Sequence, residues 1–185
     1  PEYRCNLRCV TCPLQDGKDN PSYIKDRMSL DVYRRICEEG KKYGLPAITV
    51  SNSNEGLLQK HLFDYIRMAQ DAGIMDIFVG TNGHLLTREM GIKLIQSGLS
   101  RLLVSIDAVT PETYLKVRKS EKFDTVVKNI HAFHKLRAEF GGRLPLIRVS
   151  MVMTSLNQHE EEMFRRQWAD IADIISIQRY IPYQG

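Results

Sequence analysis

The sequence of 185 residues lacks several features that would place it in common protein classes. It has no apolar run near the roughly 20 residues of a membrane-spanning helix, and no signal peptide is visible. No internal repeat or low-complexity tract is found. Its formal net charge is only +4, a weak bias towards anionic partners that does not predict nucleic-acid binding. We therefore expect a protein that binds neither a membrane nor nucleic acid.

Cysteine is scarce and unevenly distributed. The chain has four cysteines, of which Cys5, Cys9 and Cys12 lie within eight residues, whereas Cys37 is remote. This distribution does not favour disulfides, and clustered free thiols indicate a reducing compartment, so we expect a cytoplasmic location. Cys37 falls on the buried side of a helical pattern and is expected to be a packed thiol.

The clustered cysteines form the pattern C-x3-C-x2-C in the run CNLRCVTC. Three thiolates can hold three irons of a [4Fe–4S] cluster and leave the fourth iron without a protein ligand. An open coordination position is typical of catalytic metal sites, a rule stated for zinc whose logic also applies to iron. The alternatives are half a zinc site or a redox dithiol. Zinc would need two further ligands, but no second C-x2-C or H-x3–5-H pattern is present, and a dithiol should open a helix, whereas Pro13 follows here.

Short apolar runs alternate with helical patterns along the chain. Strands are predicted at 47–51, 76–80, 102–106, 146–152 and 174–177, as near-continuous apolar runs typical of parallel strands covered by helices. Helix starts are predicted at Ser29, Thr87 and Thr110, and Asn157 with Glu160 has the spacing of a capping box. The alternation predicts an α/β protein with a parallel sheet. Ligands of such sheets bind at the carboxyl ends of the strands, where we sought site residues.

The cysteine run resembles the signature of the radical S-adenosylmethionine (radical SAM) superfamily. The resemblance covers essentially the whole chain and implies a partial (β/α)6 TIM-like barrel whose first strand is missing before the cysteines. Residues 1–185 would then be the core domain of a longer protein. The segment most resembles the SPASM/Twitch-type subgroup, which implies a domain with auxiliary Fe–S clusters beyond residue 185.

The resemblance also implies cofactor contacts after two strands. Family members usually read G-G-E-P-L-L after the first of these, a segment that holds the methionine amino group. Here Ser53, Asn54 and Glu55 occupy the first three positions and only the glutamate and both leucines match, which leaves Glu55 as an acceptor for the ammonium. Thr81-Asn82-Gly83 matches a T-N-G segment that lies near the cofactor and implies a role for Asn82.

Further along the chain, Ser105-Ile106-Asp107 and a helix ending in Tyr-x-x-Val-Arg resemble the family's carboxylate-binding segments. Ser105 and Arg118 are thereby implied to contact the methionine carboxylate, for which arginine is the natural bidentate partner. The alternative for Arg118 is a solvated helix face among neighbouring lysines. The resemblance implies contacts on the adenine side by Met153 and Tyr180.

The activity implied by the resemblance is reductive cleavage of S-adenosylmethionine at a [4Fe–4S] cluster with one open iron site. The resulting 5'-deoxyadenosyl radical would abstract a hydrogen from a peptide or a small-molecule substrate. Peptide or protein modification is the first expectation, and dehydrogenation or epimerisation of an aminosugar or cyclitol is the second. A flavodoxin- or ferredoxin-type protein would be the reductant. From another class, the alternative is a non-enzymatic protein whose metal or cluster serves folding or sensing. No general acid or base is predicted.

Overall fold

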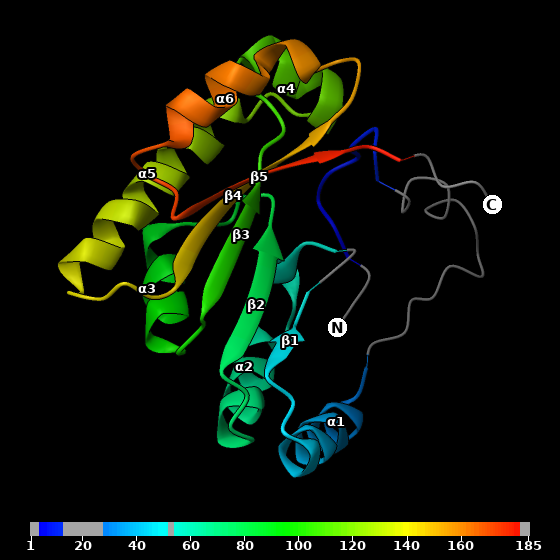
Figure 1. Ribbon diagram of the computed structural model, residues 1–185, viewed down its shortest axis with the longest axis vertical. Coiled ribbons are helices and arrows are strands. Elements are labelled where there is room, and N and C mark those ends of the chain that lie inside the picture. The colour runs from blue at the N-terminus through cyan, green and yellow to red at the C-terminus, as the bar shows by residue number, and fades with distance from the viewer. Residues whose placement is uncertain (1–3, 13–27, 52–53, 182–185) are drawn as a thin grey trace.

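A five-stranded parallel sheet forms the centre of the computed structural model, which describes residues 4–12, 28–51 and 54–181 (Figure 1). The strands follow one another across the sheet in chain order, and each neighbouring pair is parallel. Every predicted strand is present, with ends shifted by at most two residues. The strands are β1 (Ala47–Thr49), β2 (Asp76–Thr81), β3 (Arg101–Ser105), β4 (Leu146–Met153) and β5 (Ile174–Arg179).

Helices connect the successive strands. They are α1 (Leu30–Tyr43), α2 (Leu62–Asp71), α3 (Arg88–Gln96), α4 (Pro111–Arg118), α5 (Phe123–Glu139) and α6 (Glu161–Trp168), with the 3-10 turns η1 (Gly56–Leu58) and η2 (Gln158–Glu160). The predicted caps are confirmed, because the side-chain oxygens of Ser29, Thr87 and Thr110 each accept a hydrogen bond from a first-turn amide. The predicted capping box at Asn157 is wrong, since its side chain makes no cap hydrogen bond and its Nδ2 donates instead to the carbonyls of Asp107, after β3, and Val152, in β4.

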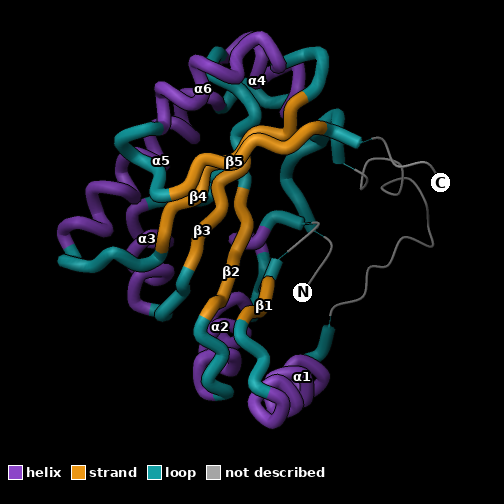
Figure 2. Tube along the Cα trace, viewed as in Figure 1, coloured by secondary structure: helices purple, strands orange, loops and turns teal. Residues whose placement is uncertain are grey.

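The sheet has one helix-covered face and one open face. In Figure 1, α3 and α5 lie on one side of β3, and the cysteine segment lies on the other side, near the tips of the strands. The strands curve without closing, since β1 and β5 are the two edges of the described sheet (Figure 2). The parallel α/β sheet was predicted from the alternation of strands and helices, and its curved, open form is the partial TIM-like barrel that the resemblance implied. Among the described residues, no helix is long and apolar enough to cross a membrane.

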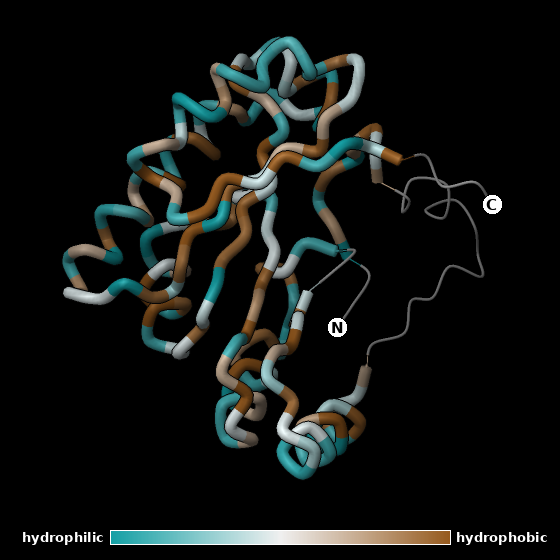
Figure 3. The backbone as a smooth tube through the Cα atoms, in the orientation of Figure 1, coloured by the Kyte–Doolittle hydropathy of each residue, from teal (hydrophilic) through white to brown (hydrophobic). Residues whose placement is uncertain are grey.

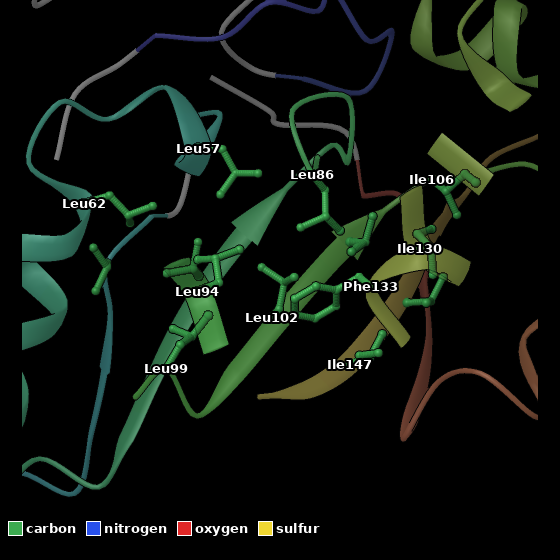
Figure 4. Close-up of a cluster of buried hydrophobic side chains, with 14 of the residues drawn as sticks. Leu57, Leu62, Leu86, Leu94, Leu99, Leu102, Ile106, Ile130, Phe133 and Ile147 are labelled. Atoms are coloured by element: carbon green, nitrogen blue, oxygen red, sulfur yellow. The ribbon is translucent and has the colours of Figure 1, made fainter. Parts of the chain in front are cut away.

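The hydrophobic core lies between the sheet and its helices. On β2 and β3, the residues Ile77, Val79, Leu102 and Val104 are buried and alternate with partly exposed ones. Figure 4 shows Leu102 near Leu94 and Phe133, and Figure 3 shows apolar residues along the strands. The alternation shows that one face of these strands is covered by helices, as their near-continuous apolar runs predicted. Their second face borders a cavity.

Candidate active site

A cavity of about 280 Å³ lies at the carboxyl ends of β2, β3 and β4. It brings together eight of the predicted site residues. Of the other three, Met153 and Tyr180 line a different hollow, and Ser53 lies outside the described residues. The lining consists of Cys5, Leu7, Cys9, Thr11, Cys12, Ser51, Asn54, Glu55, Phe78, Gly80, Thr81, Asn82, Leu103, Ser105, Asp107, Arg118 and Val152.

The cysteine segment is fixed to the sheet by hydrogen bonds from three directions. The amide of Val10 donates to the carbonyl of Val117 at the end of α4 (2.9 Å), and the amide of Glu55 donates to the carbonyl of Arg4 (2.8 Å). The side chain of Asn82 donates to Asn6 Oδ1 (2.7 Å). These bonds connect the segment to the regions that follow β1, β2 and β3. The three thiols thus come from one short segment of the sequence, and hydrogen bonds from the strand ends hold the backbone of that segment beside the cavity.

The arrangement of the thiols fits a multi-iron cluster better than a single ion. Cys9 is buried and Cys5 and Cys12 are half-buried, and all three border the cavity. Within the described part of the chain, no three Cys, His, Asp or Glu side chains converge to hold one metal ion. A structural zinc site needs such convergence. In a [4Fe–4S] cluster each cysteine binds a different iron, so its ligands need not converge on one point.

Glu55 joins the loop after β1 to the end of β2. Its Oε1 accepts hydrogen bonds from the Thr81 hydroxyl (2.5 Å) and the Leu57 amide (3.0 Å), and its Oε2 accepts from the Asn82 amide (2.6 Å). Burial raises the pKa of Glu55 above its ordinary value, and these hydrogen bonds oppose the rise. Three of the roughly four acceptor positions of a carboxylate are therefore filled by the protein. One position is left for a cationic group in the cavity.

Arg118 is buried, which rules out the alternative of a solvated helix face at this position. The residue is 8% exposed, because the end of α4 turns its side chain towards the cavity and away from the exposed lysines on either side. Its Nη1 donates to Cys9 Sγ (3.3 Å), and its Nε lies 3.0 Å from Asp107 Oδ2 as an ion pair. Burial alone would lower the pKa of Arg118, but Asp107 and Cys9 hold it above its ordinary value. The guanidinium therefore stays charged.

Asp107 is a site residue to which the sequence reasoning gave no role. It is 1% exposed and has a φ of 61°, in the left-handed region that residues other than glycine seldom adopt. Its Oδ1 accepts from the Val152 amide (2.7 Å), and its carbonyl accepts from Asn157 Nδ2 (2.9 Å). Burial raises the pKa of Asp107, and Arg118 opposes that rise. The sequence offered one signal for this role, because Asp107 directly follows a predicted strand, where ligands of parallel sheets bind.

The other predicted contacts divide between two sites. Ser105 borders the cysteine cavity, with its Oγ 3.1 Å from Ser150 Oγ on the neighbouring strand. Met153 and Tyr180 line a second hollow of about 440 Å³ at the ends of β4 and β5. The Tyr180 amide donates to the Met153 carbonyl (2.9 Å), which holds the two strand ends together. The second hollow is completed by Thr154, Ser155, Gln158 and Arg179.

Two of the curated proteins that resemble this chain are GTP 3',8-cyclases or probable ones. The chain is 29% identical over 171 residues to a GTP 3',8-cyclase of Desulforamulus reducens, covering 91% of this chain and 50% of the cyclase. It is 30% identical over 180 residues to a probable GTP 3',8-cyclase of Methanocaldococcus jannaschii, covering 97% of this chain and 56% of that protein. The chain thus spans about half the length of the relatives that it matches.

Solved structures share the fold at lower identity. Streptococcus suis SuiB bound to S-adenosylmethionine matches the whole chain with a TM-score of 0.80 and 16% identity, over 40% of SuiB. The structure of anSMEcpe with bound AdoMet also matches the whole chain, with a TM-score of 0.73 and 15% identity, over 51% of that protein. Residues 2–166 match the family model of the Radical SAM superfamily. Since this match spans most of the 185 residues, the chain belongs to the radical SAM superfamily.

Proposed function

We propose that this chain is the core of an enzyme that reductively cleaves S-adenosylmethionine and abstracts a hydrogen atom from a substrate. One observation carries the proposal: the three cysteines meet Glu55, Ser105 and Arg118 around a single cavity. Three cluster ligands, a carboxylate for an ammonium, and a guanidinium for a carboxylate are the groups that such a cofactor needs. They come from four separate parts of the chain.

Each group has a distinct part in binding. When bound, the [4Fe–4S] cluster supplies the electron that cleaves the sulfonium. Arg118 offers further N–H donors to the methionine carboxylate, and the Ser105 hydroxyl adds another. Glu55 accepts a hydrogen bond from the ammonium. The adjacent residues Asn54 and Asn82 border the same part of the cavity.

We place the adenine side of S-adenosylmethionine at the second hollow. Met153 and Tyr180 lie there at the ends of β4 and β5, where an apolar side chain and an aromatic ring can contact a purine. Ser53 completes the proposed contacts at the methionine end.

For the substrate, we propose a peptide or protein side chain. This choice rests on the resemblance to the SPASM/Twitch-type subgroup and on the fold shared with SuiB, which has been solved bound to its precursor peptide SuiA. On the same basis, residues 1–185 form a core domain followed by a domain with auxiliary clusters. An iron content well above about four atoms per full-length protein would support the presence of that domain.

GTP is the second candidate substrate. The observation that favours it is the 29–30% identity to proteins named GTP 3',8-cyclase or probable GTP 3',8-cyclase, which extends over most of this chain. The match covers 91–97% of this chain but only 50–56% of those proteins. Identity in this half therefore weighs more for the cofactor than for the substrate.

A flavodoxin- or ferredoxin-type protein is the proposed reductant. Lys116, Lys119 and Lys122 are exposed near the end of α4, to which the Val117 carbonyl attaches the cysteine segment. These exposed lysines, with Glu121 between two of them, lie close enough to the cluster ligands to attract an acidic electron carrier. Lys119→Glu should slow reduction by flavodoxin and leave reduction by dithionite unchanged. Equal slowing by both reductants would contradict this docking surface.

The decisive experiment uses the full-length protein, reconstituted without oxygen. Iron, sulfide and zinc are quantified, and 5'-deoxyadenosine is measured after addition of dithionite and S-adenosylmethionine. We expect at least about four irons and formation of 5'-deoxyadenosine, with loss of both in a Cys9→Ala variant. Incubation with a candidate peptide, GTP or an aminocyclitol then tests the substrate by accelerated product formation. Zinc in place of iron, or a cluster without cleavage, would leave a structural metal protein.

A further inference from the structure

We propose that Arg118 raises the reduction potential of the cluster by donating a hydrogen bond to Cys9, and that Asp107 holds Arg118 in place for this role. Asp107 is a positioning residue, because it acts through Arg118. The inference rests on the proposed cluster site, and it gives Arg118 a role before S-adenosylmethionine binds.

Arg118 has two partners, a hydrogen bond to Cys9 and an ion pair with Asp107. Nη1 lies 3.3 Å from Cys9 Sγ and Nε lies 3.0 Å from Asp107 Oδ2. The planar guanidinium carries several N–H donors in a fixed geometry, so these two contacts set its orientation and leave other donors for a carboxylate in the cavity. The same side chain can therefore contact the cluster ligand and the cofactor.

Asp107 is itself immobilised from the neighbouring strand. Its Oδ1 accepts from the Val152 amide (2.7 Å), and its carbonyl accepts from the amide of Asn157, which also donates to the Val152 carbonyl (3.0 Å). Asp107 is 1% exposed and Asn157 is fully buried. Asn157 thus fixes Asp107, which fixes the guanidinium against Cys9. A surface arginine would have no comparable constraint.

This geometry stabilises the reduced form of a cluster. Reduction adds one electron, whose charge is shared by the iron and sulfur atoms. A charged N–H donor to a ligand sulfur gains strength as that sulfur becomes more negative. Hydrogen bonds to the sulfurs and solvent exposure are known determinants of cluster potentials. Because Arg118 is buried, solvent screens the effect only weakly.

The chain offers a matched control in Arg137. This arginine is also 8% exposed and is also paired with an aspartate, Asp173. It lies at the opposite, amino-terminal end of β4 and β5, where it donates to the carbonyl of Pro145 (3.1 Å). Replacing either arginine removes the ion pair of a buried guanidinium, although Asp173 is more exposed than Asp107, and only Arg118 contacts a cluster cysteine.

The test is a redox titration of the reconstituted full-length protein without S-adenosylmethionine, followed by electron paramagnetic resonance of the reduced cluster. In Arg118→Gln we expect the ratio of reduced to oxidised cluster at a fixed potential to fall about tenfold, a midpoint lower by about 59 mV for a one-electron couple. Arg118→Lys keeps the charge but cannot contact both partners, so its midpoint should lie between. Arg137→Gln should keep the wild-type midpoint.

The outcomes separate the inference from the proposed function. An intact cluster in Arg118→Gln with the wild-type midpoint would overturn the inference alone. If Arg118→Gln loses its iron, the midpoint of Arg118→Lys decides: a value below the wild-type midpoint would support the inference, and the wild-type midpoint would overturn it. Equal loss of iron from Arg118→Gln and Arg137→Gln would overturn it by showing only a folding role. A wild-type protein without a four-iron cluster would refute the proposed function and the inference together.

Discussion

Replacement of Glu55 by glutamine tests whether the loop after β1 is held in place by a buried carboxylate. The two side chains have nearly the same shape, so the exchange opens no cavity. Glutamine retains one acceptor oxygen, which can still meet the Thr81 hydroxyl and the Leu57 amide. Its NH2 group then faces the Asn82 amide, which lies 2.6 Å from Glu55 Oε2 in the native protein. Two donors would be opposed there.

The magnitude follows from these three hydrogen bonds. Two of them change from charge-assisted to neutral, at a cost of roughly 1 kcal/mol each, and the opposed pair leaves a buried donor unsatisfied, at roughly 1–3 kcal/mol. Removing a buried charge offsets part of this cost, since burial raises the pKa of Glu55 and so disfavours its ionised form. We expect Glu55→Gln to lower the free energy of unfolding by about 2–3 kcal/mol and to weaken binding of S-adenosylmethionine.

The assay combines urea unfolding with calorimetric titration of S-adenosylmethionine on the anaerobic protein. Glu160→Gln is the control, because Glu160 is also 1% exposed and binds the Val109 amide (2.5 Å) and the Thr110 hydroxyl (2.6 Å) without lining the cavity. The Glu160→Gln protein should be less stable than the wild type and should keep the wild-type affinity for S-adenosylmethionine. A Glu55→Gln protein with wild-type stability, or with wild-type affinity, would refute the reasoning.

Three further changes probe the supports of the site. In Gly56→Ala the new Cβ would lie 2.4 Å from a backbone carbonyl oxygen of β2, so η1 must move. We therefore expect a lower melting temperature and weaker binding of S-adenosylmethionine. An unchanged melting temperature would contradict this close approach. Asn157→Ala removes the bonds to Asp107 and the β4 end and should cost about 3 kcal/mol in urea unfolding, with a cost below about 1 kcal/mol counting against the network. The pKa of Asp173 is lowered from its ordinary value of 3.8. Burial raises this pKa, but the hydrogen bonds from Arg137 and the Ile147 amide, together with the charge of Arg137, lower it by more. Asp173 therefore stabilises the fold above that value and less as the pH falls, so the stability difference from Asp173→Asn should shrink towards pH 3 and should not stay constant.

Much of the fold follows from local features of the sequence. The strands were predictable from short apolar runs, and three helix starts were predictable from Ser29, Thr87 and Thr110, because a capping side chain bonds an amide only three residues away. The spacing of the cysteines likewise lies within one short segment. Asn157 shows the limit, since the same cap spacing is present there but its side-chain amide donates to the carbonyl of Asp107, 50 residues away.

The tertiary structure decided how the site groups are paired. Arg118 and Cys9 are 109 residues apart, and Glu55 and Asn82 are 27 apart, so no periodicity relates them. Arg118 has lysines beside it in the sequence, and only the packing of α4 against the cysteine segment determines that it is buried. Parallel strands place their carboxyl ends at one edge, so residues that follow different strands meet there. The sequence determined which groups are available, and the folded sheet determined which of them touch, because burial and long-range hydrogen bonds depend on neighbours that are remote along the chain.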